Sequence, residues 1–592
     1  MSITIWTSYN NIAFKINPGP DFKDDRERLK LISGKIPIYD FDKFKHWEIP
    51  KSSLNKLFIV YQNKVLIQDD AKEYINFYKL QTANVSSLPK TAILVKPFNQ
   101  EKFFKLDPYQ EDYIGIYEKR LGILGLLDMS AGKTLCSLLM AANRTYTKLL
   151  IVVPAQIITE WQAAVEDILG LEALTYTGSI PKKKRQMLDL ASANIIICNP
   201  EMIKEINEEK LKIDSVIVDE VHIIGTGQAY KELKKLTRKV FKVGGTVQGL
   251  TATPIENDIE DLWYLVNLLN PELAGDKQEF LSKYREPTYF INVPNPRAEG
   301  EFYKKAVKFK PKNMEELKEF IAAASFRVSS KLFIKTNNNK QIIPVDMTKR
   351  QKEVYEEIRE SLILLSKDKT FYLNNPLTRL NKVLQAAEGI YNIYPNEVES
   401  GKMDYIVHEL NECVVSGRKA VVRFMFKEGS NILHSYYPNT AVLINGDQSS
   451  DLKFLAKLAF QGSDNKKHIE RFNELRGKHK YPFGLKEAQF LFSTYSTRSG
   501  MGENLGLCDI QYFMSYSFSS SAFKQTTGRI VRRNSLFDDV YTKMLVSKDT
   551  VESFYVRQLL TKLENLANLM DGQQSAADVL SARDIVRMLE EI

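Results

Sequence analysis

The stretch Gly125–Thr134, GLLDMSAGKT, decides the fold, because it ends in the Ala-Gly-Lys-Thr of a phosphate-binding loop. The complete pattern G-x-x-x-x-G-K-[ST] places a glycine five positions before Gly132, where this chain has Leu127. An apolar run precedes the loop, and TLCSLLMAAN after it has a helical pattern. Loop amides followed by a helix N-terminus are well placed to bind phosphate oxygens. The stretch therefore predicts a strand, a phosphate-binding loop and a helix.

Short apolar segments rich in Ile, Val and Leu recur in two series along the chain. Their length and composition are typical of strands that are covered on both faces of a parallel sheet. We therefore predict an α/β fold with two units and a ligand-binding cleft between them. The segments are LGILGLLD, KLLIVVP, NIIICNP, SVIVDE and VQGLTATP in the first series, and KAVVRFMF, NTAVLING, EAQFLFST and IQYFMSYS in the second.

Two acidic residues follow one of these strands. In SVIVDEVH, Asp219 and Glu220 come at the end of the apolar run, at the sheet edge where nucleotides bind in such folds. Asp219 would hold Mg²⁺, mainly through water, while Glu220 would orient and deprotonate the attacking water. A helix N-cap is the alternative for Asp219, but it leaves the second carboxylate unexplained.

The loop itself and two later segments supply the remaining candidates. Lys133 would contact the β- and γ-phosphates and Thr134 would ligate Mg²⁺. Thr251 and Thr253, in GLTATPIEN, end a strand where their hydroxyls could sense the γ-phosphate. In QTTGRIVRR, Arg529 and Arg532 are expected on one face of a helical turn. There they would reach across the cleft as arginine fingers rather than form surface salt bridges. The loop residues expected to bind nucleotide are Met129, Ser130, Ala131, Gly132, Lys133 and Thr134.

Composition favours an ordinary globular protein with sizeable cores. With 82 Lys and Arg against 73 Asp and Glu, the net charge is +9, which suits a polyanionic partner or a merely basic surface. The clusters at 181–185 (PKKKR) and 476–481 (RGKHKY) are expected to be exposed loops that contact nucleic acid or simply face solvent. Four scattered cysteines and the lack of a signal peptide or an apolar run of about 18 residues predict a cytoplasmic protein.

The order of these motifs resembles the superfamily-two helicase-type motors, and most closely the Swi/Snf-type double-stranded DNA translocases. The resemblance covers roughly 105–545 and is carried by LDPYQED, LLIVVPAQIITEWQAAVED, IICNPEMI, TATPIENDIEDLWYLVNLLNPELAG and STRSGMGENLGLCD. It implies two tandem RecA-like lobes, ATP and Mg²⁺ as cofactors, and DNA, duplex or branched, as the partner. By position it also assigns adenine recognition to Gln110 and a further nucleotide contact to Gly502. His222 and Gln525 would couple the lobes, and the DNA-contacting residues would be Pro154, Asn199, Thr494 and Arg498.

The sequence also departs from the Swi/Snf pattern. Such loops commonly read Asp-Glu-Met-Gly-x-Gly-Lys-Thr, so that Ser130 replaces a glycine, and we expect it to keep a negative φ. The last motif continues Val531, Arg532, Arg533, Asn534, Ser535 where His-Arg-Ile-Gly-Gln is usual, an ending closer to viral phosphohydrolases. That ending predicts a phage or viral source, and hence the host cytoplasm as the location.

Five regions are predicted. Residues 1–98 form a small α+β accessory domain that weakly resembles the harp-type domain of annealing helicases through Tyr39, Trp47 and Pro50, or is a generic accessory domain. Residues 99–275 form the ATP-binding lobe, 276–400 a helical inter-lobe segment, 401–548 the second lobe and 549–592 a helical tail. In this tail and in MTKRQKEVYEEIRESLILLSK the apolar residues recur at helical spacing.

The sequence therefore predicts a DNA-dependent ATPase that moves on or remodels duplex DNA in repair, recombination or replication-fork processing. Three alternatives remain open: a strand-separating helicase, an ATPase associated with RNA polymerase in transcription, and a non-catalytic DNA-binding scaffold. The last is supported only by Leu127 and Ser130 in the loop.

Overall fold

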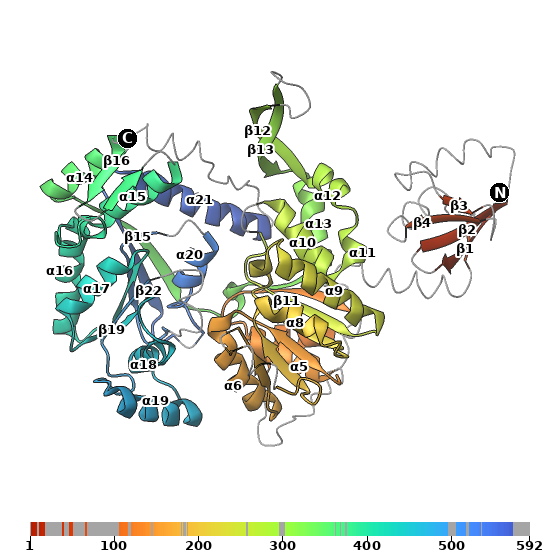
Figure 1. Cartoon of the computed structure of the whole chain (residues 1–592), viewed down its shortest axis with the longest axis horizontal. Coiled ribbons are helices and arrows are strands. Elements are labelled where there is room, and N and C mark those ends of the chain that lie inside the picture. The colour runs from red at the N-terminus through yellow and green to blue at the C-terminus, as the bar shows by residue number, and fades with distance from the viewer. Residues whose placement is uncertain are drawn as a thin grey trace.

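The structure is a computed structural model of the whole chain (Figure 1). It describes residues 2–8, 11–17, 38–40, 46–50, 65–67 and 106–571. Within the last range, the residues outside the description are 117–119, 144–145, 179, 182–184, 186–187, 256–257, 295–301, 361–362, 367–368, 373–375, 495–504, 517–519 and 534.

The first lobe is built on a seven-stranded sheet in which every paired neighbour is parallel, in the order β14-β6-β11-β10-β7-β9-β8 (Figure 1). The apolar runs of the first series form these strands, as predicted. The bounds are β6 Gly122–Leu127, β7 Leu149–Val152, β8 Leu174–Tyr176, β9 Ile195–Cys198, β10 Ser215–Asp219, β11 Thr246–Leu250 and β14 Ser325–Val328.

Both faces of this sheet are covered, which explains why its strands are continuous apolar runs. Along β7, Leu150 and Val152 belong to one buried cluster, while Leu149 and Ile151 belong to another on the opposite face. The covering helices are α4 Pro108–Ile116, α5 Lys133–Asn143, α6 Ile158–Leu169, α8 Ile203–Glu208, α9 Gln228–Lys242, α10 Ile259–Leu269, α11 Pro271–Ala274, α12 Lys277–Tyr284 and α13 Met314–Ala324.

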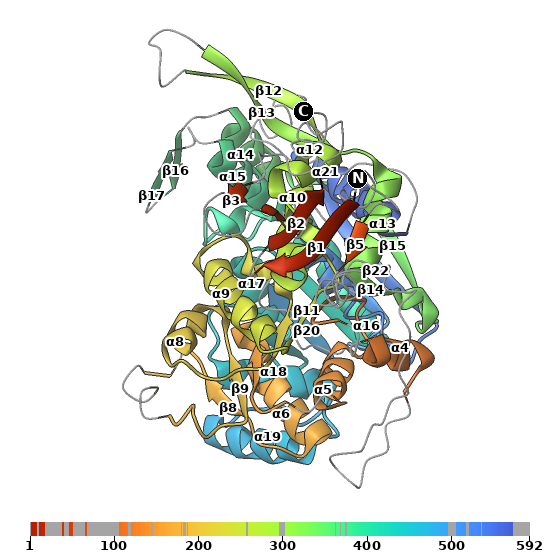
Figure 2. The ribbon, with the colours of Figure 1, turned by 90° about the vertical axis from the view of Figure 1, so that its right-hand side faces the viewer.

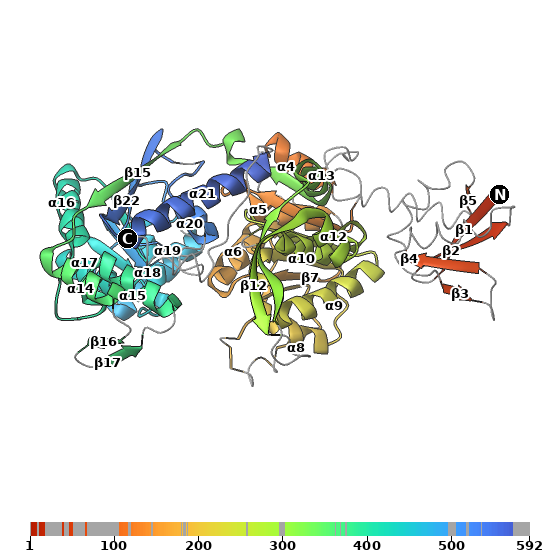
Figure 3. The same ribbon diagram turned by 90° about the horizontal axis from the view of Figure 1, so that it is seen from above.

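The second lobe repeats this plan with six parallel strands in the order β15-β22-β21-β18-β20-β19 (Figure 3). The two parallel-sheet lobes confirm the predicted α/β class. The strands are β15 Asn337–Val345, β18 Ala420–Phe424, β19 Ala441–Ile444, β20 Phe490–Thr494, β21 Ile510–Phe513 and β22 Asp539–Ser547. The helices are α14 Lys349–Glu360, α15 Pro376–Glu388, α16 Gly401–Ser416, α17 Lys427–Tyr436, α18 Ser450–Gln461, α19 Lys466–His479, α20 Ser520–Thr527 and α21 Val551–Asp571.

The segment between the lobes is more than a helical insertion. It supplies an edge strand to each large sheet, β14 to the first and β15 to the second. It also contains two separate antiparallel pairs, β12 Arg285–Pro294 with β13 Phe302–Pro311, and β16 Ile363–Ser366 with β17 Lys369–Tyr372. The helical pattern predicted in MTKRQKEVYEEIRESLILLSK is present as α14 up to Glu360, but it was wrong for the end of the segment, where Ile363–Ser366 form β16.

The two basic clusters that were predicted to be exposed loops differ from that prediction at Arg185, which is buried, and in the second cluster, which is exposed but largely helical. Arg185 is buried because its guanidinium pairs with Glu205 and donates to the Ile180 carbonyl oxygen. The second cluster is largely helical, since α19 continues to His479. Phe472 and Leu475, on the apolar side of α19, pack into the second lobe. Because this packing stabilises α19, the helix continues into the basic cluster.

The N-terminal strands form a five-stranded sheet in the order β3-β4-β2-β1-β5, with bounds β1 Ser2–Ser8, β2 Asn11–Asn17, β3 Ile38–Asp40, β4 His46–Pro50 and β5 Val65–Ile67. Tyr39 and Trp47, on which the harp-type resemblance rests, are paired across β3 and β4. The segment AKEYINFYKL, whose sequence has a helical pattern, lies outside the described residues.

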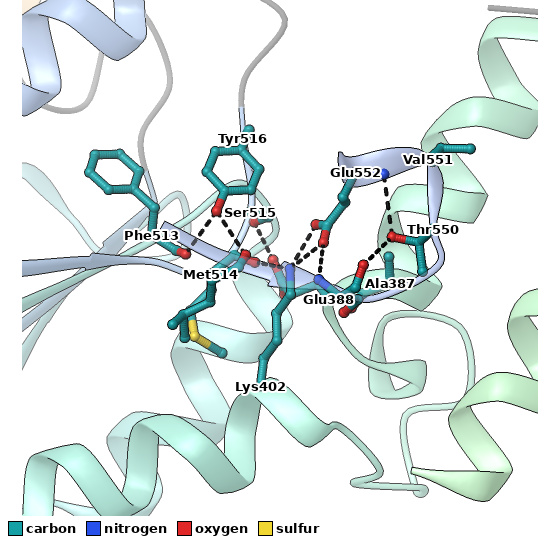
Figure 4. A network of polar contacts seen from close by, with 12 residues as sticks. Ala387, Glu388, Lys402, Phe513, Met514, Ser515, Tyr516, Thr550, Val551 and Glu552 are labelled. Carbon is teal, nitrogen blue, oxygen red and sulfur yellow. Dashed lines mark hydrogen bonds and ion pairs between the residues drawn. The ribbon is translucent and has the colours of Figure 1, made fainter. Parts of the chain in front are cut away.

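A buried polar network ties helices of the second lobe to the end of β21 (Figure 4). Lys402 and Glu552 are both completely buried, and Lys402 Nζ lies 2.6 Å from Glu552 Oε2 and 2.8 Å from the Met514 carbonyl oxygen. Ser515 Oγ donates to Glu388, whose burial raises the pKa of its carboxyl to about 7. The network fixes the chain just before α20.

Among the described residues, none of the helices has the length and hydropathy that crossing a bilayer requires.

Candidate nucleotide site

The candidate site lies at the carboxyl edge of the first sheet. The loop 128–132 follows β6, Asp219 ends β10, and Thr251 follows β11. Because β6, β11 and β10 are parallel neighbours, their carboxyl ends meet at one edge. The sequence-predicted residues are therefore brought together by the topology of the sheet.

The loop turns through two residues with positive φ. Gly132 has φ 83°, and a Cβ there would lie 2.6 Å from Gln110 Nε2, so this position requires glycine. Gln110 is buried against the loop and donates from Nε2 to the Ala131 carbonyl oxygen at 3.1 Å. Ser130 has φ 64°, so the expected negative φ was wrong. The backbone at this position has the left-handed conformation that a glycine adopts readily, and Ser130 adopts it despite the steric cost of its Cβ.

The acid pair is held by its neighbours. Trp161 Nε1 donates to Asp219 Oδ2 at 3.0 Å, and the Glu220 backbone N–H donates to Asp219 Oδ1 at 2.9 Å. Glu220 has φ 47°, a left-handed conformation that is uncommon for this residue type and concentrates at functional sites. The two carboxyl groups are thus fixed side by side at the end of β10.

A chain of polar contacts runs from the loop to the segment after β11. Lys133 Nζ lies 3.7 Å from Glu220 Oε1, and His222 Nδ1 lies 3.4 Å from Glu220 Oε2. His222 Nδ1 is also 2.8 Å from Thr251 Oγ1, which accepts from the Thr253 N–H at 3.0 Å. The structure therefore connects Lys133, Glu220, His222 and both threonines, although the roles assigned to them stay predictions.

The pKa values of the Asp219 and Glu220 carboxyl groups are shifted in opposite directions. Burial raises the pKa of Asp219, and the adjacent Glu220 charge raises it further. Burial also acts to raise the pKa of Glu220, but Lys133, His222 and Arg529 together outweigh it and hold this pKa below its usual range. Glu220 is therefore ionised at neutral pH, as a proton acceptor must be.

The predicted arginines come from the other lobe. Helix α20 ends at Thr527, so the expectation that Arg529 and Arg532 share a helical turn was wrong. Both lie in the turn that follows, where Arg532 Nε donates to the Arg529 carbonyl oxygen at 3.3 Å. Arg532 also donates from a terminal nitrogen to Ser130 Oγ at 3.1 Å. One arginine thus reaches the loop, and the other lies close enough to lower the pKa of Glu220.

This turn and the preceding helix α20 make further contacts across the lobes: Arg533 with Asp107, Lys524 with Asp128, and Gly528 with Met129. We call these contacts the seam. Both terminal nitrogens of Arg533 pair with the Asp107 carboxylate, with one separation of 3.1 Å. Lys524 Nζ lies 3.6 Å from Asp128 Oδ1. A Cβ at Gly528 would lie 2.0 Å from Met129 Cε, so that the Met129 side chain would have to move. The two lobes are therefore in contact along the loop.

Three of the predicted DNA-contacting residues lie within the described residues, and all three are at strand ends. Pro154 follows β7, Asn199 follows β9 and Thr494 ends β20 in the second lobe. The Asn199 side chain accepts from the Gly178 N–H at 3.2 Å and donates to Glu201. Gln525 is buried in α20. The remaining predicted residues, Arg498 and Gly502, lie outside the described residues, as does the motif-five segment around them.

Sequence reasoning missed two kinds of residue here. Trp161 was read only as part of a family motif, yet its indole holds Asp219. The others are Asp107, Lys524 and Arg533, which form ion pairs between segments that are far apart in the sequence. The one available signal was the departure at Arg533, where an arginine replaces the usual isoleucine.

The residues present fit a magnesium nucleotide. Glu220 Oε2 is buried and accepts no hydrogen bond within the described part of the chain, which leaves an acceptor for a water. Thr134 and Asp219 offer one hydroxyl and one carboxylate, which suits Mg²⁺ because this ion usually keeps waters and takes one or two carboxylates plus phosphates. Lys133 at the start of α5 would meet the phosphates.

These features define a two-lobed α/β nucleotide-binding protein in which each lobe contributes to one site. The model of the SNF2-related domain family matches residues 59–392, and the chain belongs to this family. Membership indicates an ATPase. The predicted Swi/Snf-type resemblance is confirmed, while the likeness to annealing helicases and the phage source stay predictions.

Several relatives share this region. Human DNA repair and recombination protein RAD54B is 25% identical over 36% of this chain and 25% of its own length. Human TATA-binding protein-associated factor 172 is 26% identical over 32% of this chain and 11% of its own. SNF2 domain-containing protein ENL1 of Oryza sativa is 22% identical over 88% of this chain and 58% of its own. The chain thus spans a quarter or less of the first two.

Among solved structures, the SWI2/SNF2 ATPase core of Sulfolobus solfataricus in complex with dsDNA is 20% identical. The match covers 81% of this chain and 96% of that one, with a TM-score of 0.35. The same core without DNA is 18% identical, with a TM-score of 0.33.

Substitution of Ser130 separates backbone strain from the hydroxyl contact. Ser130→Gly and Ser130→Ala both remove the Arg532 contact, but only glycine relieves the left-handed φ, which costs other residues about 1–2 kcal/mol. Because bound phosphate would impose this turn on the loop, we expect the Gly variant to bind a fluorescent ATP analogue about five- to thirtyfold more tightly than the Ala variant. Equal dissociation constants would show that nucleotide binding imposes no such strain.

Proposed function

We propose that this protein is an ATP-driven motor that translocates on duplex DNA. The observation that carries the proposal is the contact between Arg532 of the second lobe and Ser130 of the phosphate-binding loop. A γ-phosphate held by the loop would lie between the lobes, so that its presence would favour the closed arrangement of the two lobes. A motor requires that the closure of its lobes depends on the bound nucleotide in this way.

Each site residue has a role in this cycle. Lys133 would hold the terminal phosphates, and Thr134 and Asp219 would hold Mg²⁺, which would supply neutralisation of the phosphate charge. Glu220 orients water and accepts its proton. Arg529 and Arg532 stabilise negative charge that develops on the transferred phosphoryl group.

Coupling between the site and the rest of the first lobe runs through His222. Its ring joins Glu220 to Thr251, and Thr251 Oγ1 in turn accepts from the Thr253 backbone N–H. A change in the charge of Glu220 would therefore alter the contacts of His222 with Thr251 and shift the segment after β11. Gln525, buried in α20, would transmit the corresponding change in the second lobe.

DNA is the partner that the chain's family and charge favour. A relative is named as a DNA repair and recombination protein, and the net charge here is +9. The strand-end residues Pro154, Asn199 and Thr494 would contact the phosphate backbone together with Arg498, while Gly502 would add a contact to the nucleotide. Because such contacts do not read bases, binding should be tolerant of sequence and should weaken steeply with salt.

An ATPase assay with different nucleic acids tests the proposal. We expect duplex DNA to raise the turnover rate at least tenfold over protein alone, and RNA or single-stranded DNA to raise it much less. The Lys133→Ala protein serves as the blank for contaminating ATPases. Turnover that is unaffected by any DNA would contradict the proposal.

A second function is favoured by one observation, that relatives include TATA-binding protein-associated factors. A transcription ATPase that acts with RNA polymerase would then be retained on immobilised polymerase even when DNA has been digested. The non-catalytic scaffold has less support, because Lys133, Asp219, Glu220 and both arginines are assembled in one site. Strand separation is the alternative to translocation within the enzymes, while annealing activity and a phage source are proposals that rest on the motifs alone.

A further inference from the structure

A short connector, residues 329–336, joins the two lobes. It begins where β14 ends at Val328 in the first sheet, and it ends where β15 begins at Asn337 in the second sheet. Its first residues form a single helical turn, Ser330–Leu332. Hinges between packed units are usually a few loop residues of this kind. The connector is therefore the place where a change in the angle between the lobes would be absorbed.

Each end of the connector is attached to one lobe. On the first lobe, the Phe333 ring stacks on the Tyr109 ring of α4, with 5.5 Å between the ring centres. On the second lobe, Thr336 Oγ1 donates to the Phe537 carbonyl oxygen at 3.1 Å. The position of the connector therefore depends on how the two lobes are arranged.

Asp128, the residue that follows β6 and begins the phosphate-binding loop, contacts this connector directly. Asp128 Oδ2 accepts from the Ser330 N–H at 2.9 Å, and the Asp128 N–H donates to the Val328 carbonyl oxygen at 3.0 Å. Within the loop, the Asp128 carbonyl oxygen accepts from the Ala131 N–H at 3.2 Å. One residue thus links the turn of the loop to the end of β14 and to the start of the connector.

The same carboxylate also contacts the second lobe. Lys524 Nζ on α20 lies 3.6 Å from Asp128 Oδ1, while the bond from the Ser330 N–H uses Oδ2. An ion pair that is partly exposed contributes little by itself, whereas a hydrogen bond from a backbone N–H to a carboxylate is one of the stronger kinds. Asp128 therefore has a main contact with the connector and a weaker one with α20, the helix that precedes Arg529 and Arg532.

We propose that Asp128 is a positioning residue that couples the phosphate-binding loop to the closure of the two lobes. Phosphate in the loop would fix the turn to which Asp128 is bonded. Asp128 would then hold the connector and α20 in the position that brings Arg529 and Arg532 to the site. In this role it acts through the connector and α20 rather than by touching nucleotide. The inference rests on the proposed function, because it names the residue through which nucleotide changes the arrangement of the same motor.

The arrangement of the lobes is measured by energy transfer between two dyes on the full chain. Figure 1 and Figure 2 both show α6 of the first lobe beside α19 of the second, and Gln162→Cys and Asn473→Cys place the dyes at exposed positions of these helices. The native cysteines are buried, so they should stay unlabelled in the folded protein. The change in transfer efficiency is recorded on adding adenylyl imidodiphosphate with Mg²⁺, without DNA, at a concentration that titration shows to be saturating for each protein.

Three variants of the labelled chain separate the two contacts of Asp128. Asp128→Ala removes both contacts. Asp128→Asn keeps an oxygen that accepts from the Ser330 N–H but loses the charge, and Lys524→Gln removes the ion pair from the other side. Glu172→Ala, at an exposed position of the first lobe after α6, is the matched control. Because the change is measured at saturation, weaker binding of the analogue would not by itself reduce it.

We expect Asp128→Ala to lose at least half of the wild-type change in transfer efficiency, and Asp128→Asn and Lys524→Gln to lose a smaller part that is equal in the two. The control should show the full change. A full change in Asp128→Ala would overturn the inference, as would a full change in both Asp128→Asn and Lys524→Gln if the Ala variant binds no analogue. A wild type that binds the analogue without any change in transfer efficiency would instead overturn the proposed function.

Discussion

Glu220→Gln should reduce the rate of DNA-stimulated ATP hydrolysis by about 10²- to 10⁴-fold, the usual contribution of a positioned general base. The glutamine keeps the size of the side chain but cannot accept the proton of the attacking water. The structure supports this choice of base, because Lys133, His222 and Arg529 hold the pKa of Glu220 below its usual range. The change is measured as turnover number at saturating ATP and duplex DNA.

Binding should survive this substitution. We expect the Glu220→Gln protein to bind the ATP analogue within a fewfold of the wild type, because the phosphate contacts come from the loop and Lys133. Glu209→Gln, an exposed position after α8, is the matched control and should leave turnover unchanged. A Glu220→Gln protein that hydrolyses ATP at the unmutated rate would show that another group is the base.

Lys402→Met should destabilise the second lobe by about 3–5 kcal/mol, the usual cost of removing one partner from a buried ion pair. Both Lys402 and Glu552 are completely buried, and the Ser547 N–H also donates to Glu552 at 3.0 Å. Without Lys402, the Glu552 carboxylate would be left in the interior with no cation to balance it (Figure 4). The measurement is amide hydrogen exchange in peptides of α16 and α21.

The double variant Lys402→Met, Glu552→Gln separates an uncompensated charge from lost packing. It removes both charges, so we expect it to recover most of the hydrogen-exchange protection that the single variant loses. Protection in the first lobe should stay the same in both proteins. If the single variant is as protected as the wild type, the pair does not hold α21 to the lobe.

The fold was predictable because its strands are buried on both faces. Segments such as KLLIVVP and KAVVRFMF are short continuous apolar runs, which are typical of parallel strands covered on both faces. The edge strands β14 and β15 were not predictable in the same way. In β15, Asn337–Val345, polar residues predominate and the strand exists because β22 pairs along its whole length.

The residues that form the site were predictable from the sequence, but their arrangement in space was predictable only in part. Lys133, Asp219, Glu220 and the threonines are local motifs at strand ends, so the topology brings them together. The positive φ of Ser130 was missed, because a serine ordinarily avoids the conformation that this loop imposes. The seam was missed because Asp107 and Arg533 are far apart in the sequence, and no pattern within either segment indicates the other.

The central claim is that ATP hydrolysis moves this protein along duplex DNA, and displacement of a third strand from a DNA triplex tests it most directly. A translocating protein removes the third strand without separating the two strands of the duplex beneath it. We expect ATP-dependent displacement by the wild type and none by the Glu220→Gln protein, with the underlying duplex intact. A wild type that hydrolyses ATP on duplex DNA but leaves the triplex in place would contradict the account.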